Sequence, residues 1–369
     1  MVKNMKRKKD LSRRIFSIGT LKTGNRNLIS DVKGVTAGHV TLDEGTARTG
    51  VTAVLPHQGN LFRDKVMAAC HVINGFGKST GTIQIDELGT LEAPIIMTNT
   101  LSAGDAFRGL VEYTLEHNPE IGRTSGTVNP VVCECNDSFL NDIRAFHVKP
   151  YHVKKAIEDA SVLFAQGDVG AGRGMSCYKL KGGIGSSSRI VEIQGKTFTV
   201  GSLVLSNFGQ MKDLVIGRSK VGESTYKIAP PMDDEEDGKG SIAVILATDA
   251  PMSSRQLKRL CKRASVGINR TGSYIENGSG EISIAFTTAN RIDHFNEEPL
   301  IPINIINEEM IDPFFLAVTE STEEAILNSL IHALPLKGRD GNYRRALSEF
   351  TEFIPEDVFI KDEEERSHV

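Results

Sequence analysis

The ten-residue run SIAVILATDA, Ser241 to Ala250, limits the fold more than any other part of the sequence. It is too apolar to keep one face in water, so we predict a strand that is covered on both faces. Such a strand belongs in the middle of a sheet that is packed between other layers. The run follows an acidic loop, Met232 to Gly240, and begins with a serine. The question that follows is why a hydroxyl group stands at the entrance of a buried strand.

The chain around this run alternates irregularly between predicted strands and helices, which indicates an α/β or α+β protein. Apolar spacing predicts helices over residues 102–117 and 152–166, and Ser253 and Ser254 are suitable caps for a further helix. Further strands are predicted over RIVEIQG, KTFTVGSLVLSNFG and EISIAFTTA. These elements supply the layers that cover the sheet.

Charge and hydropathy exclude several classes of function. The 369 residues carry a formal net charge of -4, which gives no general reason to expect a nucleic-acid partner. The first 14 residues are strongly basic, but the apolar stretch of a signal peptide does not follow them. We therefore predict a basic flexible tail over residues 1–27 and a single domain over residues 28–369. No run of about 18 apolar residues occurs, so no membrane span is predicted.

The five cysteines do not form a metal or disulfide pattern. They are odd in number and irregularly spaced, which favours reduced thiols and a cytoplasmic location. Cys133 and Cys135 are the one close pair, and neither a second close pair nor a His pair completes a zinc site. No H-E-x-x-H motif occurs either. The expectation is an enzyme or binding protein without a metal or another cofactor.

Two glycine-rich stretches are poor matches to nucleotide-binding motifs. GFGKST, Gly75 to Thr80, has Val72 where a phosphate-binding loop needs glycine. GAGRG, Gly170 to Gly174, lacks the spacing of a dinucleotide fingerprint, and we interpret it as a place of close backbone or substrate approach. A Ser-His-Asp hydrolase is also disfavoured, because His39, His57 and His71 are more typical of structural residues.

The Gly-Lys-Gly that precedes Ser241 suggests a different chemistry. A serine in this position can attack the carbonyl of Gly240, form an ester and, after hydrolysis, become a new N-terminus. The freed α-amine, with a reference pKa near ~8, can then act as the base for the hydroxyl without a histidine. The alternative is that Ser241 merely ends a loop.

Eight blocks, taken in order, carry a family resemblance: ISDVKGVTAGHVTL, GFGKSTGTIQIDELGTLEAPIIMTNTLSAGDAF, PVVCECNDSFLNDI, GMSCYKLKGGIGSSSR, TVGSLVLSNFG, GSIAVILATDAP, NGSGEISIAFTTAN and TEEAILNSL. Together, from about Leu28 to about Leu347, they resemble the self-processing serine aminopeptidase family of the L-aminopeptidase D-amidase/D-esterase and the β-peptidyl aminopeptidases. The resemblance implies an α/β, four-layer αββα sandwich of the N-terminal-nucleophile kind. It also implies self-cleavage into an α segment (28–240) and a β segment (241–369), and a homo-oligomer, namely a tetramer of αβ units.

The same resemblance assigns catalytic residues by matching positions. Ser241 matches the nucleophile, and Gly240-Ser241 matches the self-cleaved bond. Ser279 and Glu281 match the pair that supports the nucleophile, and alternation along a strand puts both on one face. Asn207 matches the asparagine that stabilises the oxyanion.

Substrate binding is assigned in the same way. Glu134 matches the carboxylate that anchors the substrate's free amine, and Asn136 is expected to share that wall. The departures are Ser206, where a small apolar residue is expected, and the cysteines on either side of Glu134, which bear on acyl-group preference.

The expected substrates are short peptides, amino-acyl amides or esters, with α- versus β-amino and L versus D preference left open. Two alternatives remain. One is an amino-acid N-acyltransferase of the ornithine acetyltransferase type, although that type resembles a threonine nucleophile. The other is a non-catalytic binding protein on the same fold.

Overall fold

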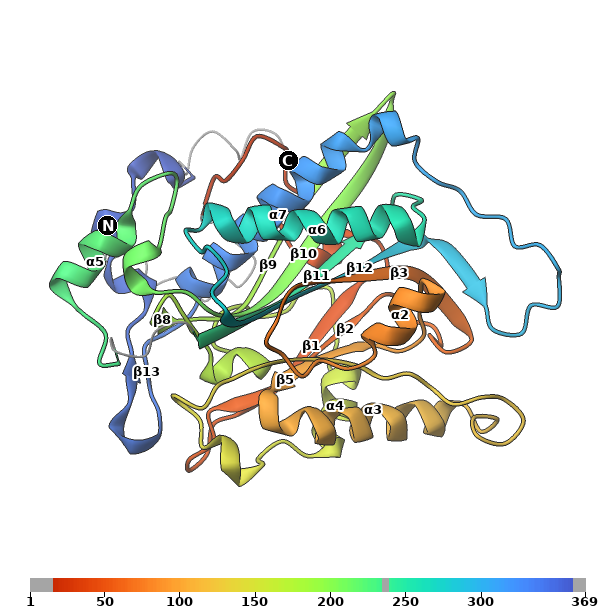
Figure 1. Cartoon of the computed structure of the whole chain (residues 1–369), viewed down its shortest axis with the longest axis horizontal. Coiled ribbons are helices and arrows are strands. Elements are labelled where there is room, and N and C mark those ends of the chain that lie inside the picture. The colour runs from red at the N-terminus through yellow and green to blue at the C-terminus, as the bar shows by residue number, and fades with distance from the viewer. Residues whose placement is uncertain (1–15, 234–238, 361–369) are drawn as a thin grey trace.

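The computed structural model describes residues 16–233 and 239–360, and within them two large sheets face one another (Figure 1). The first sheet has the strand order β1 (Thr36–Leu42), β2 (Thr49–Leu55), β5 (Ile95–Asn99) and β6 (Val131–Cys135). The second has the order β4 (Thr90–Leu91), β3 (Asp64–Gly75), β12 (Gly278–Asp293), β11 (Lys239–Thr248), β10 (Lys196–Asn207) and β9 (Gly183–Ile193). Short hairpins are formed by β7 (Ser176–Cys177) with β8 (Leu180–Lys181), and by β13 (Leu336–Lys337) with β14 (Tyr343–Arg344).

Helices cover the outer face of each sheet, so the layers run helix, sheet, sheet, helix (Figure 1). Helices α3 (Ala103–His117) and α4 (Pro150–Glu158) pack on the first sheet, and α6 (Ser254–Arg270) and α7 (Asp312–Ile331) pack on the second. The shorter helices are α2 (Thr82–Leu88) and α5 (Val221–Ile228). Among the helices of the described ranges, none has both the length and the apolar character needed to cross a bilayer.

Strand β11 confirms the prediction of a doubly covered strand. It lies between β10, to which it is antiparallel, and β12, to which it is parallel. Ala243 and Ile245 face the core between the two sheets, whereas Val244 and Leu246 face the core beneath α6 and α7. Because alternate side chains point to opposite faces and both faces are buried, the whole run must be apolar.

The helix that was predicted after Ser253 is confirmed as α6. The Ser253 hydroxyl accepts the Gln256 N–H at 3.3 Å, and the Gln256 side chain accepts the Ser253 N–H at 3.2 Å. This reciprocal capping satisfies two donors that a helix start leaves open.

The helix predicted over residues 152–166 is wrong in its extent, since α4 begins at Pro150 and ends at Glu158. The chain then extends, and the Ser161 N–H donates to the Ala37 carbonyl at 3.0 Å.

Residues 16–27 correct the predicted tail. Phe16 is fully buried, and its ring stacks on Phe359 with a centroid distance of 5.6 Å. The backbone N–H groups of Thr20 and Leu21 donate to the Glu320 carboxylate at 2.7 and 3.0 Å. A segment next to a basic stretch can still pack against the domain when it has a buried apolar side chain and backbone N–H groups that donate to a carboxylate. Residues 1–15 of the predicted tail lie outside the described residues.

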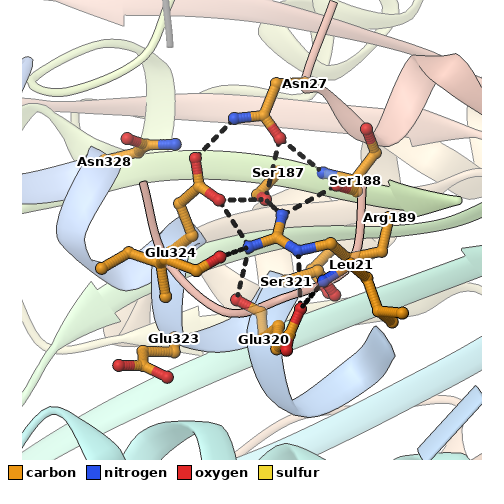
Figure 2. A network of polar contacts seen from close by, with 12 residues as sticks. Leu21, Asn27, Ser187, Ser188, Arg189, Glu320, Ser321, Glu323, Glu324 and Asn328 are labelled. Atoms are coloured by element: carbon orange, nitrogen blue, oxygen red, sulfur yellow. Dashed lines mark hydrogen bonds and ion pairs between the residues drawn. The ribbon is translucent and has the colours of Figure 1, made fainter. Parts of the chain in front are cut away.

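A buried charge network holds this segment between β9 and α7 (Figure 2). Arg189 is fully buried, and its guanidinium donates to Glu324 at 2.6 Å and to Glu320 at 3.2 Å. The Asn27 amide donates to Glu324 at 2.6 Å and accepts from the Ser187 hydroxyl at 3.0 Å. Removing one member of such a network leaves a buried charge without its partner, so the network strongly specifies how these segments meet.

Candidate active site

A cavity of about 300 Å³ lies where β6, β10 and β11 come together. Of the seven residues assigned from the sequence, five line it: Glu134, Asn136, Asn207, Gly240 and Ser241. The remaining two, Ser279 and Glu281, lie on the neighbouring strand β12. The other lining residues are Phe76, Lys78, Thr100, Ser138, Phe139, Ser176, Lys179, Phe208, Gly209, Asp233, Gly278 and Arg344.

Ser241 stands near the start of the central strand β11. It pairs with Asn207 on β10 and with Gly280 on β12, so its backbone position is set from both sides. The residue is 5% exposed, and within the described part of the chain its hydroxyl oxygen has no hydrogen-bond partner. Because Ser241 lines the cavity, its hydroxyl can be reached by a ligand that enters there.

Close packing around residue 240 requires a glycine at this position. A Cβ atom there would lie 2.9 Å from the Phe208 Cα atom and 3.1 Å from the Ser279 hydroxyl oxygen. Both distances are shorter than ordinary van der Waals contacts, so a side chain would displace the backbone or the hydroxyl. The absence of a side chain lets Ser279 approach the Gly240-Ser241 peptide closely.

Ser279 and Glu281 form a hydrogen-bonded pair on one face of β12, as strand alternation predicts. The Ser279 hydroxyl donates to one Glu281 oxygen, and the other oxygen has no partner within the described residues. Glu281 is 1% exposed, and burial raises the pKa of its carboxyl from about 4.5 to about 7. The carboxyl can therefore accept or release a proton near neutral pH.

Asn74 supports this pair, and the sequence analysis missed it. Its side-chain amide donates to the backbone carbonyl of Ser279 and, at 3.0 Å, to that of Glu276. Asn74 lies opposite Glu281 in the antiparallel pairing of β3 with β12. This role follows only from the pairing of β3 with β12 and from the register of that pair. About 200 residues separate the two strands in sequence, so local patterns do not predict it.

Glu134 is held rigidly at the cavity wall. One carboxylate oxygen accepts the Lys78 backbone N–H at 2.7 Å, and the other accepts the Thr100 hydroxyl. Glu134 is 7% exposed and keeps an edge on the cavity. The GFGKST stretch, which resembles a phosphate loop only weakly, thus supplies a backbone donor to a carboxylate. An oriented, largely desolvated carboxylate suits an ammonium group.

Asn207 is fixed through both ends of its amide. The side-chain oxygen accepts the Ser176 N–H at 2.8 Å, and the side-chain nitrogen donates to the Asn136 carbonyl at 3.0 Å. An amide nitrogen carries two hydrogens, so a second donor remains for a ligand. The Asn136 side chain instead accepts the Ser138 N–H at 3.0 Å, and its link to the site is through its carbonyl.

A charged wall that was not predicted from the sequence lines the cavity beside Asn207. Arg344 donates twice to Asp233 at 2.6 Å, donates to the Ser176 hydroxyl at 2.9 Å and stacks over Phe139. Lys179 donates to the Asp233 carboxylate at 3.1 Å. Burial works to raise the pKa of Asp233, but hydrogen bonds and charge from Arg344 outweigh it and hold that pKa below its ordinary value.

The nearby cysteines are unsuited to nucleophilic or metal chemistry. Burial raises the pKa of Cys133 to about 12 and that of Cys135, which lies beside Ser241, well above its ordinary value. Thiols in this state react poorly, since the thiolate is the nucleophile and the metal ligand. Within the described ranges, no group of three or more His, Cys, Asp or Glu side chains is placed to hold a metal ion.

Comparisons with known proteins identify the family of this chain. The model of peptidase family S58 matches residues 27–344. The beta-peptidyl aminopeptidase BapA of Sphingosinicella microcystinivorans is 40% identical over 341 residues, covering 87% of this chain and 85% of the relative. The crystal structure of the PH0078 protein from Pyrococcus horikoshii OT3 has a TM-score of 0.87 and 51% identity, covering 91% and 97% of the two chains.

A further solved structure adds the fold type. The L-aminopeptidase D-Ala-esterase/amidase of Ochrobactrum anthropi has a TM-score of 0.83 and 37% identity, covering 89% of this chain and 93% of the neighbour. It is described as a prototype for the serine aminopeptidases and a new variant among the Ntn hydrolase fold. The fold, the cavity around Ser241 and these similarities define a serine hydrolase with an Ntn-type fold. The chain belongs to peptidase family S58 and is an aminopeptidase, so the resemblance seen in the sequence is confirmed.

Proposed function

We propose that this protein is a self-processed serine aminopeptidase that cuts its own Gly240-Ser241 bond and then uses Ser241 as an N-terminal nucleophile. Its substrates are short peptides, amino-acyl amides or esters with a free amine. The observation that carries the proposal is the convergence of Glu134, Asn207 and Ser241 on one cavity. An amine anchor, an oxyanion donor and a nucleophile are the three parts that this reaction needs.

Self-cleavage begins with attack of the Ser241 hydroxyl oxygen on the Gly240 carbonyl carbon. The carbon-nitrogen bond breaks, the nitrogen gains the proton as a free amine, and an ester joins the two segments. Water then hydrolyses the ester, leaving a Gly240 carboxylate and a free Ser241 hydroxyl. The Ser279-Glu281 pair beside Gly240 suits the proton transfer, because its carboxyl has a pKa of about 7. The αββα sandwich then consists of two segments that remain packed together.

Catalysis on a substrate follows the same chemistry. Glu134 holds the substrate ammonium group, and Ser241 attacks the carbonyl of the first residue. The α-amine of Ser241, freed by cleavage, takes the hydroxyl proton with the help of the Ser279-Glu281 pair and passes it to the leaving amine. Asn207 donates to the oxyanion, an interaction worth roughly 3 kcal/mol in comparable sites. Water then cleaves the acyl-enzyme and releases the amino acid.

We also propose a homo-oligomer, namely a tetramer of αβ units. Its support is the segment between β12 and α7, which extends away from the sheets (Figure 1). Its exposed apolar side chains are Leu300, Ile301, Ile303 and Ile305. Contiguous exposed apolar groups are typical of protein interfaces. Light scattering of the purified protein measures the assembly, and a monomer at micromolar concentration would contradict this part of the proposal.

Intact mass spectrometry tests the self-cleavage. Purified protein is expected to give two chains, with Ser241 at the second N-terminus. Ser241→Ala is expected to give one uncut chain without hydrolysis of amino-acyl p-nitroanilides. Ser265→Ala on the outer surface of α6 is the matched control and should be cut and active. An uncut wild-type chain that hydrolyses these substrates would refute the N-terminal nucleophile mechanism.

A further inference from the structure

The glycine-rich stretch GAGRG leads directly to the predicted oxyanion donor. It forms the short helix η4 (Gly170–Gly174), and a Cβ atom on Gly172 would lie 2.6 Å from the Ile184 backbone nitrogen. The stretch is thus a place of close backbone approach, as was predicted from the sequence. The chain then enters β7 at Ser176, whose N–H donates to the Asn207 side-chain oxygen at 2.8 Å.

The ammonium group of Lys181 holds the end of this stretch. Its nitrogen donates to the carbonyl oxygens of Gly172 at 3.0 Å, Met175 at 2.9 Å and Gly182 at 2.8 Å. Lys181 is fully buried, and burial lowers its pKa to about 7, while the charge of Asp168 works to raise that pKa. An ammonium group has three hydrogens and a neutral amine has two, so the three acceptors match the charged form. A buried positive charge is therefore directed at the backbone of this stretch.

A chain of hydrogen bonds connects this charge to the oxyanion donor. The Met175 carbonyl and the Ser176 N–H belong to the same peptide group, which binds Lys181 through its oxygen and Asn207 through its N–H. The amide nitrogen of Asn207 in turn has a hydrogen for the oxyanion. All three links donate in the same direction. Hydrogen bonds arranged in this way polarise one another, by about 10–30% per bond. The charge on Lys181 therefore makes the Asn207 amide a stronger donor.

The same contacts fix the direction of the Asn207 amide. The Met175 carbonyl accepts the Gly182 N–H at 3.1 Å in addition to the Lys181 ammonium group. Two donors on one oxygen hold the plane of the peptide group, and the Ser176 N–H in that plane holds the Asn207 oxygen. Stabilisation of an oxyanion requires donors that are oriented before the reaction begins. Loss of the ammonium group would leave the peptide plane with one of its two donors.

We propose that Lys181 is a positioning residue for the oxyanion site, where its ammonium group orients and polarises the Asn207 amide through the Met175-Ser176 peptide group. The inference rests on the proposed aminopeptidase function and deepens it on the side of transition-state stabilisation. Because Lys181 acts through Asn207, it contributes only where Asn207 contributes. It therefore supports kcat and leaves the binding of the substrate amine at Glu134 unchanged.

A double-mutant cycle on the hydrolysis of amino-acyl p-nitroanilides tests the proposal, with kcat referred to the amount of cleaved enzyme. Lys181→Met keeps the apolar stem and removes the ammonium group. It is expected to lower kcat at least about tenfold, with KM within about twofold of the wild type. Asn207→Ala alone should lower kcat about 100-fold to 1,000-fold. In the Asn207→Ala background, Lys181→Met should lower kcat less than about twofold, because no amide remains to be oriented.

Arg189→Met is the control for the loss of a buried cation. Arg189 is also fully buried, and its carboxylate partners lie on α7. This variant should lower the unfolding temperature and keep kcat within about twofold of the wild type. Three results with Lys181→Met would overturn the assignment. They are an unchanged kcat, a loss that lies wholly in KM, and a loss in kcat of the same factor with and without Asn207, which would indicate a structural role only.

Ser176→Pro decides the question if Lys181→Met does not yield folded, cleaved protein. Proline has no N–H, and Met175 already has the extended backbone that a following proline needs, with φ -78° and ψ 147°. Ser176→Pro should lower kcat at least about tenfold more than Ser176→Ala, which keeps the N–H, and equal values would overturn the assignment. If the cleaved wild-type protein hydrolyses no p-nitroanilide, or if Asn207→Ala leaves kcat unchanged, the proposed function fails, and this inference fails with it.

Discussion

Replacing Glu281 by Gln separates the catalytic use of this carboxyl from its effect on stability. In the folded protein the pKa of Glu281 is about 7, against about 4.5 for an ordinary glutamate, because burial disfavours the charged form. The folded state therefore binds this proton more tightly than the unfolded chain does. Stability falls as the pH rises from about 4.5 to about 7, and the loss is complete above pH 7. The pKa difference corresponds to a loss of about 3 kcal/mol.

Glutamine keeps the shape and the oxygen that accepts the Ser279 hydroxyl, but it cannot ionise. The free energy of unfolding of Glu281→Gln, relative to the parent, is therefore expected to rise by up to about 3 kcal/mol between pH 4.5 and pH 8. Any cost of burying the glutamine amide is the same at every pH and cancels in this comparison. Urea unfolding in a Ser241→Ala background measures this difference in the free energy of unfolding at each pH, without interference from self-cleavage. Glu112→Gln, on the exposed surface of α3, is the control and should show no such pH dependence.

Activity should change in the opposite direction. With Ser241 present, Glu281→Gln is expected to lower kcat about 100-fold, in the range for a lost proton-transfer group. The rise of activity through pH 7 in the parent should also disappear. A gain in stability with a loss of activity is typical of a residue kept for function. A stability difference that stays constant from pH 4.5 to pH 8 would refute the reasoning, because it would mean that Glu281 does not titrate near 7.

Three further substitutions test other parts of the structure. Gly240→Ala is expected to slow self-cleavage at least about tenfold on a denaturing gel, because its methyl group would lie 2.9 Å from the Phe208 Cα atom; unchanged kinetics would remove the steric argument. Glu134→Gln should raise KM about tenfold or more for substrates with a free amine, and an equal KM would exclude the anchor role. Arg189→Met should lower the free energy of unfolding by about 3–5 kcal/mol, because Glu324 loses its buried partner; a change below about 1 kcal/mol would contradict the network's importance.

Local sequence patterns were sufficient to predict the central strand β11 and the start of helix α6. The apolar run after Ser241 requires burial of both faces, and β11 has both faces buried. The Ser253 hydroxyl accepts a hydrogen bond from the Gln256 N–H, three residues further along the chain. Its capping role can therefore be predicted without tertiary information. The alternation of Ser279 and Glu281 likewise follows from strand geometry alone. The extent of α4 and the packing of residues 16–27 were mispredicted, because contacts with β1 and α7 determine them.

The sequence by itself determined the family, the nucleophile candidate and the residue types expected around it, because these depend on short blocks and strand periodicity. Only the tertiary structure brought Asn74 to the Ser279-Glu281 pair and Thr100 to Glu134. It also brought Arg344, on a hairpin near the end of the described chain, to the wall that contains Lys179. Strand order, register and hairpin placement set these contacts across many tens to hundreds of residues. Local propensity cannot encode them, since they exist only once both sheets have paired and packed.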